Sequence, residues 1–219
     1  MPSHLALAEL LLIATIGVGA TSWNYYAGKK RTREMKLVAE RLGFKFTPVD
    51  GRSLLFNLGG SYLFSRGHSA KVTNLMEDGE NLAIFDYTYV IGYSRNRRSY
   101  VQTVMAFRLP GLVLPIFCLR PEHVWHEVGA WFGQQDIDFD RWPAFSSNYL
   151  LQGRNEEAVR KLFTDDVVVF FEQTKGLSTE GNGAWLMFYR HWVRVLIEDL
   201  PSFIEEGSRV RALFDHATS

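Results

Sequence analysis

Cysteine, net charge and known catalytic motifs are scarce or absent in this chain of 219 residues. The single cysteine, Cys118, has no partner for an internal disulfide, so nothing indicates an oxidising compartment. Basic and acidic residues balance at 24 each, whereas nucleic-acid-binding domains usually carry a basic excess. Hydrophobic residues make up 47% and aromatic residues 14%, which excludes a disordered chain. We therefore expect a folded protein that does not bind nucleic acid.

The sequence also lacks the short motifs of common enzymes. It contains no Gly-x-Ser-x-Gly, no P-loop and no Gly-x-Gly-x-x-Gly. Cys118 lies in an apolar run, where a free cysteine is usually a small buried residue, although the neighbouring Arg120 could activate its thiol. We predict no catalytic residue, no cofactor and no bound metal.

One group of side chains leaves an enzyme as the alternative. His123 and His126 are three apart on a predicted helix, but zinc hydrolases need His-Glu-x-x-His or His-x-x-Glu-His. Asp136, Asp138 and Asp140 match the opening of a calcium loop, but the Gly at its sixth position and the Glu at its twelfth are missing. The alternative function is a hydrolase, metal-assisted or not, with its site near the two histidines and the first two aspartates.

The N-terminus is the most informative segment. Residues 5–26 form an apolar run of 22 residues with one charge, Glu9. As a helix, this run would extend about 33 Å, enough for a hydrocarbon core of about 30 Å. Aromatic residues end the run and basic residues follow, as at a membrane interface: Trp23, Tyr25, Tyr26, Lys29, Lys30, Arg31 and Arg33.

This asymmetry also predicts orientation. Residues 1–28 contain no Lys or Arg, and flanking basic residues stay on the cytoplasmic side. We therefore expect a single-pass anchor (residues 1–28) in the inner (plasma) membrane, with the N-terminus outside. A juxtamembrane segment (29–45) and a cytoplasmic domain (46–219) would follow. A cleaved signal peptide and a buried core helix are the alternatives, but the first lacks a basic n-region and the second is rarely apolar on every side.

Beyond the anchor, the hydrophobic period predicts an α+β domain of antiparallel strands and packed helices. A helix over 33–42 is expected to continue the anchor after a break at Gly28. Residues 81–93 alternate with one buried face, and with 100–107 they predict a hairpin. Residues 71–77 would pair with this sheet. The run 112–119 predicts a third strand, at an edge or with a bulge because of Pro115.

The C-terminal half predicts further elements and an internal boundary near 136–143. We expect helices over 121–133, after Asn155, over 164–174 and over 202–216, a strand over 148–152, and a hairpin about Asn182-Gly183. Tyr62, Leu63, Val72 and Leu75 match Tyr149, Leu150, Val159 and Leu162 at a constant offset of 87, which would make the two halves similar sub-units.

The tip of the first hairpin carries a compact basic cluster of Arg95, Arg97 and Arg98. A phosphate, an anionic lipid headgroup or an acidic protein partner could dock there, although a solvated turn is the favoured explanation because hairpin tips tolerate such residues.

Five segments together resemble a bacterial family of uncharacterised, single-pass membrane-anchored proteins: FDYTYVIG (85–92), YVQTVMAF (100–107), LRPE (119–122), FSSNYLLQG (145–153) and VRKLF (159–163). The resemblance implies a membrane location and an α+β domain, and it brings no catalytic residues. We interpret the chain as a membrane-tethered binding or scaffold domain, with the bilayer and an anionic lipid or protein as its partners.

Overall fold

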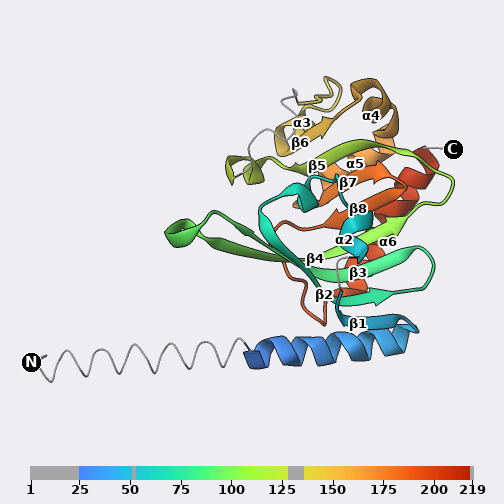
Figure 1. Cartoon of the computed structure of the whole chain (residues 1–219). Helices are drawn as coiled ribbons and strands as arrows, with labels where there is room; N and C mark the ends of the chain where they lie inside the picture. The colour runs from blue at the N-terminus through green and yellow to red at the C-terminus, as the bar shows by residue number, and fades with distance from the viewer. Residues whose placement is uncertain (1–24, 51–52, 128–135, 218–219) are drawn as a thin grey trace, which may run out of the picture.

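A computed structural model describes residues 25–50, 53–127 and 136–217, with the backbone alone at 125–127. Within these residues, eight strands form one antiparallel sheet in the order β1-β2-β3-β4-β8-β7-β5-β6 (Figure 1). The strands are β1 (Lys45–Val49), β2 (His68–Glu77), β3 (Leu82–Ile91), β4 (Arg98–Arg108), β5 (Leu114–Pro121), β6 (Tyr149–Gly153), β7 (Ser178–Gly183) and β8 (Trp185–Tyr189). The fold is therefore α+β, as predicted.

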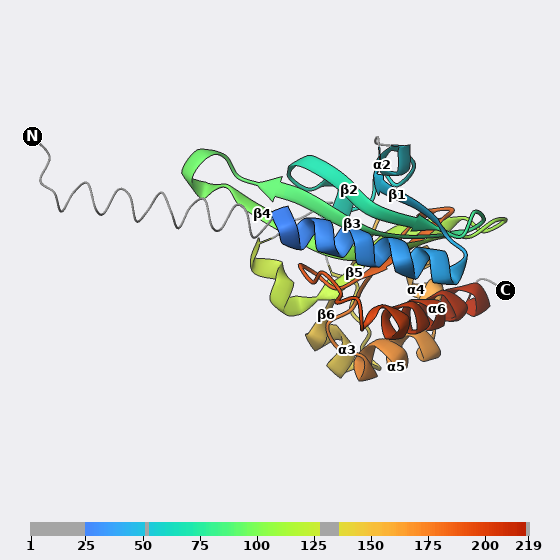
Figure 2. The same ribbon diagram turned by 90° about the horizontal axis from the view of Figure 1, so that it is seen from below.

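Helices and short helical turns surround the sheet. They are the N-terminal helix (residues 25–42), α2 (Ser53–Asn57), η1 (Leu63–Ser65), η2 (Ser94–Asn96), η3 (Glu122–Glu127), α3 (Pro143–Asn148), α4 (Glu156–Leu162), α5 (Asp165–Gln173) and α6 (Leu200–Ala217). The N-terminal helix, α4, α5 and α6 lie on one face of the sheet (Figure 2). The segment with α2 and η1 covers the other face, over β2, β3 and β4.

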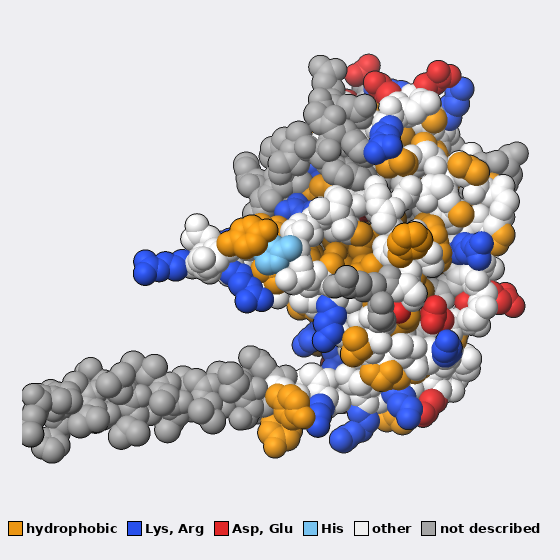
Figure 3. Space-filling model, viewed as in Figure 1, with side chains coloured by type: hydrophobic (Ala, Val, Ile, Leu, Met, Phe, Trp, Pro, Cys, Tyr) orange, Lys and Arg blue, Asp and Glu red, His pale blue; other side chains and the backbone are white. Residues whose placement is uncertain are grey.

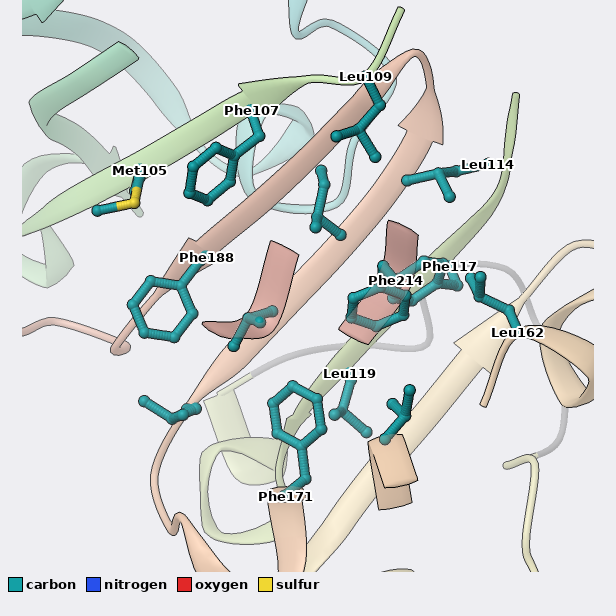
Figure 4. Packing of buried hydrophobic residues seen from close by; sticks show 14 of the residues in the cluster. Met105, Phe107, Leu109, Leu114, Phe117, Leu119, Leu162, Phe171, Phe188 and Phe214 are labelled. Atoms are coloured by element: carbon teal, nitrogen blue, oxygen red, sulfur yellow. The ribbon is translucent and has the colours of Figure 1, made fainter. Parts of the chain in front are cut away.

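The helical face holds the larger hydrophobic core. Side chains from β4, β5 and β8 interdigitate there with side chains from α4, α5 and α6 (Figure 4). Gly207 allows α6 to approach the sheet, because a Cβ at this position would lie 2.5 Å from the sulfur of Met105. The buried side of α6 includes Phe203, Val210 and Phe214, as predicted.

Most predicted strands and helices are present. The hairpins 81–107 and 177–189 form as β3–β4 and β7–β8, and β2 pairs with β3. Asn155 caps α4, accepting a hydrogen bond from the backbone N–H of Ala158 at 3.1 Å. The predicted helix over 164–174 is present as α5.

The N-terminal helix differs from the prediction at Gly28, and most of the predicted membrane anchor lies outside the described residues. The helix is continuous through Gly28, whose carbonyl accepts a hydrogen bond from the Thr32 hydroxyl, so the expected break is absent. The predicted anchor, residues 1–28, lies outside the described residues except for residues 25–28. Among the helices that are described, none combines the length and the apolarity that a membrane crossing requires.

Two strands are more buried than expected. The second face of β3 also lies in the core, because the N-terminal helix packs over it, and Asp86 is only 2% exposed. β5 lies between β6 and β7, so it is not an edge strand. The irregularity at Pro115 is a shift in the register with β7 between Leu114 and Phe117, in agreement with the predicted bulge.

Further corrections concern the middle of the chain. Pro121 ends β5, and the described part of the predicted helix over 121–133 is the 3₁₀ helix η3. β5 pairs with strands on the far side of the connection 136–143, so one sheet contains strands from both halves. The residues proposed as a repeat lie in different elements: Val72 is in β2, whereas its match Val159 is in α4. The halves are therefore not similar sub-units.

Candidate functional site

The basic tip of the β3–β4 hairpin extends well beyond the sheet (Figure 1). A tight turn forms it: Gly92 has φ +76°, and a Cβ there would lie 2.5 Å from the carbonyl oxygen of Asn96. The ring of His68 supports the base of the turn by stacking on Tyr93 at 4.6 Å between centroids. The arginines at the tip, Arg95, Arg97 and Arg98, are all exposed, and so is Tyr93.

The start of the N-terminal helix carries the same combination of side chains. Tyr25 and Tyr26 are 58% and 69% exposed. The ammonium group of Lys29 lies 4.5 Å from the centre of the Tyr25 ring, and Lys30 and Arg33 are exposed beside it. Trp23, predicted at the same interface, lies outside the described residues.

The hairpin tip and the start of this helix project to the same side of the molecule in two perpendicular views (Figures 1 and 2). The space-filling view shows basic side chains at the tip and hydrophobic side chains at the start of the helix (Figure 3). We call this side, defined by residues 25–33 and 93–98, the basic face.

Arg31 requires a correction, because it does not contribute to the basic face. Its guanidinium is buried and contacts both carboxylate oxygens of Asp86, at 2.6 and 2.8 Å. It also donates to the carbonyl of Val195 at 2.7 Å and to the hydroxyl of Thr103 at 3.2 Å. Arg31 thus holds the helix against β3, β4 and the loop before α6. Its spacing from the buried Met35, four residues along the same face, is the signal that sequence analysis missed.

A groove of about 1490 Å³ lies between the N-terminal helix and residues 192–201. Ala27, Val38 and Leu42 line the helical wall, and Leu196 and Ile197 line the opposite wall. Since the two walls come from distant parts of the chain, no local pattern in the sequence predicts this groove.

A second group of polar residues is buried inside the sheet. Glu180 accepts hydrogen bonds from the Tyr189 hydroxyl at 2.5 Å and from the backbone N–H of Leu63 at 3.1 Å. Burial raises the pKa of the Glu180 carboxyl to about 7, although these hydrogen bonds and Arg120 act in the opposite direction. The guanidinium of Arg120 is buried 4.5 Å from the centre of the Tyr62 ring.

His191 and Ser178 form a pair at the edge of this buried group. The Ser178 hydroxyl and Nδ1 of His191 are 2.7 Å apart. Burial lowers the pKa of the imidazole to about 3, so it is neutral at physiological pH. Ser178 is 0% exposed, and a substrate therefore has no access to its hydroxyl. The pair serves the packing of β7 against the loop after β8.

The described residues of the alternative enzyme site, His123, Asp136 and Asp138, are not assembled into a ligand set. His123 and Asp138 are exposed, and the side chain of His126 lies outside the described residues. Asp136 accepts a hydrogen bond from the backbone N–H of Leu151 at 2.9 Å, and burial raises the pKa of its carboxyl to about 6. In the described part of the chain, no three His, Cys, Asp or Glu side chains are arranged to hold a metal ion.

Cys118 is buried in β5, as expected for a packed thiol. It is 1% exposed, and burial together with the nearby Glu180 raises the pKa of the thiol well above its ordinary value. The thiolate needed for nucleophilic chemistry is therefore disfavoured.

These features define an α+β protein with one antiparallel sheet, its longer helices on one face, and a basic face formed by the hairpin tip and the start of the N-terminal helix. No protein-family model matches the sequence, and the comparison with curated proteins finds no match. Among solved structures, the mycobacterial trehalose monomycolate transport factor A, TtfA, is similar, with a TM-score of 0.58 and 14% sequence identity. The similarity covers 85% of this chain and 93% of TtfA. The two proteins share a fold.

Proposed function

We propose that this protein is a membrane-tethered binding or scaffold domain that rests on an anionic cytoplasmic leaflet through its basic face. Residues 1–28 would anchor it in the inner membrane with the N-terminus outside. We extend the proposal to membership of the bacterial membrane-anchored family that the sequence resembles.

The observation that carries this proposal is the shared direction of two separate structures. The hairpin tip and the start of the N-terminal helix point the same way (Figures 1 and 2), and each combines exposed tyrosine with cations. Tyrosine rings favour the headgroup region of a bilayer, and each Lys or Arg near an anionic surface contributes about 1 kcal/mol. A helix that emerges from the membrane beside the tip would bring both into contact with lipid.

The similarity to TtfA supports a role connected with lipid. That protein is named for the transport of trehalose monomycolate, a lipid. At 14% identity, the shared property is the fold, so a lipid-related role for this chain is part of our proposal.

A fluorescent probe at the tip tests the docking. The full chain, reconstituted in nanodiscs, would carry an environment-sensitive fluorophore on Asn96→Cys. Labelling is selective because the native Cys118 is buried. We expect blue-shifted emission in nanodiscs with phosphatidylglycerol, and less shift in pure phosphatidylcholine or at high salt.

The control probe is placed on Glu80→Cys, in the turn at the opposite end of β3. This position is about 30 Å from the tip, given ten strand residues at about 3.3 Å each. The double variant Arg95→Gln, Arg97→Gln removes about 2 kcal/mol of attraction and should lower the docked population relative to the undocked by about 30-fold. Equal emission from both probes, or no response to lipid charge, would refute the proposed docking.

A further inference from the structure

The groove beside the N-terminal helix has the size and lining of a site for an amphiphile. Typical pockets for small molecules measure about 300–1,000 Å³, and this groove is larger, at about 1490 Å³. One wall is a face of the N-terminal helix, the other is the loop 192–199 with the start of α6, and Val101 of β4 also lines the groove.

The loop wall is held in place by hydrogen bonds from the sheet. The backbone N–H of Val195 donates to the Thr103 hydroxyl at 3.0 Å, and the backbone N–H of Thr103 donates to the carbonyl of Val193 at 3.0 Å. The indole of Trp192 donates to the Tyr89 hydroxyl at 3.2 Å. With the buried Arg31 joining the loop to the helix, both walls are fixed before any ligand arrives.

The groove combines exposed apolar side chains with cations. Leu42 and Leu196 are 45% and 57% exposed, so a ligand that covered them would remove apolar surface from water. Arg33, Arg41 and Arg194 line the same groove, and none of them has an ion-pair partner among the described residues. Two carboxylates also line the groove. They are Glu34, which is paired with Lys30 at 3.7 Å, and Glu198.

We propose that this groove binds a single anionic phospholipid taken from the adjoining leaflet. Its phosphate would lie against Arg33 and Arg194, and an acyl chain would cover Val38, Leu196 and Ile197. The inference rests on the proposed function, because the groove begins at Tyr26, in the last residues of the predicted membrane anchor. Charge complementarity favours an anionic headgroup, and the apolar walls favour a chain over a free phosphate.

Photo-crosslinking in nanodiscs tests this site. The full chain would be reconstituted in phosphatidylcholine containing a small fraction of phosphatidylglycerol with a diazirine on its acyl chain. After irradiation, mass spectrometry locates the label. We expect label in residues 33–42 and 192–201, competed by unlabelled phosphatidylglycerol and not by the same amount of additional phosphatidylcholine.

Two matched double variants decide whether the groove cations bind the headgroup. Arg33→Glu with Arg194→Glu should lower groove labelling at least about tenfold, since two attractive charges become repulsive. Lys71→Glu with Lys175→Glu changes the net charge equally at exposed positions outside the groove and should leave labelling within about twofold. Thermal unfolding of both variants checks that the fold is retained.

The outcomes separate this inference from the proposed function. Equal labelling by a phosphatidylcholine probe, label confined to other regions, equal loss in both double variants or a crosslink between two copies of the chain across the groove would each overturn the lipid site. The fluorophore on Asn96→Cys reports docking independently. A docked tip with an unlabelled groove therefore leaves the proposed function standing and rejects only the site.

Discussion

The buried ion pair between Arg31 and Asp86 yields the sharpest prediction of stability. Asp86 accepts two hydrogen bonds from Arg31, one from the Asn74 amide at 2.9 Å and one from the Thr103 hydroxyl at 2.9 Å. Replacing Asp86 by Ala would leave the Arg31 guanidinium buried without its counter-charge. Breaking a buried pair in this way costs about 3–5 kcal/mol, a large part of the roughly 5–15 kcal/mol that stabilises a domain.

Thermal unfolding of the full chain in detergent, followed by circular dichroism, measures this effect. At about 2–4 °C per kcal/mol for a chain of this size, Asp86→Ala should lower the Tm by roughly 10 °C. The double variant Arg31→Met, Asp86→Leu removes both charges and should recover most of the loss, because an apolar pair can replace a buried ion pair.

Lys161→Met provides the control for this prediction. It breaks the exposed pair with Glu157, whose side chains are 75% and 80% exposed, and should cost no more than about 0.5 kcal/mol. Our account of the N-terminal helix would be refuted if Asp86→Ala changed the Tm no more than this control does. A double variant as unstable as the single one would refute it equally.

Two further predictions concern the core. Since the pKa of Glu180 is raised from 4.5 to about 7, the folded chain retains this proton where the unfolded chain releases it, so stability falls as the pH rises through that window. Glu180→Gln should therefore raise the Tm relative to the wild type more at pH 8 than at pH 5, and an equal difference at both values would contradict the assignment. Gly207→Val should destabilise the protein by about 1–3 kcal/mol in urea unfolding because its Cβ would overlap Met105, whereas Ser208→Val on the exposed side of α6 should cost less. Equal losses would show that α6 does not depend on close approach at Gly207.

The elements that the sequence predicted are those whose signals are local. Alternation over 81–93 and the Asn182-Gly183 turn each encode a hairpin within a few residues, and both hairpins form. The Asn155 cap is equally local. Such signals depend on the backbone of neighbouring residues, so distant contacts rarely change them.

The predictions that failed required knowledge of contacts between distant segments. The basic run containing Arg31 predicts that this residue lies at the membrane interface. In the structure, Arg31 is buried in an ion pair with Asp86, 55 residues away. The alternation in the sequence places Asp86 on the solvent-exposed face of its strand. Its burial instead follows from the same contact with Arg31. The groove depends on two segments at least 150 positions apart, so its apolar and basic residues have no common pattern in the sequence.

The candidate site was predicted in part. The sequence predicts Arg95, Arg97 and Arg98 as a compact cluster, and the structure places them at an exposed tip. No local sequence pattern predicts that these arginines and the start of the N-terminal helix lie on the same side, because this depends on how the helix packs across the sheet. That alignment is what connects the two basic segments in our proposal.

Protease protection of a C-terminal tag tests the central claim, that the folded domain lies on the cytoplasmic side of the membrane. The tagged full chain would be compared in bacterial spheroplasts and in inverted membrane vesicles, with known cytoplasmic and external proteins as controls. We predict that the tag sediments with membranes, survives protease added to spheroplasts and is removed from inverted vesicles. Removal in spheroplasts with survival in inverted vesicles, or a tag found wholly in the soluble fraction, would contradict the account.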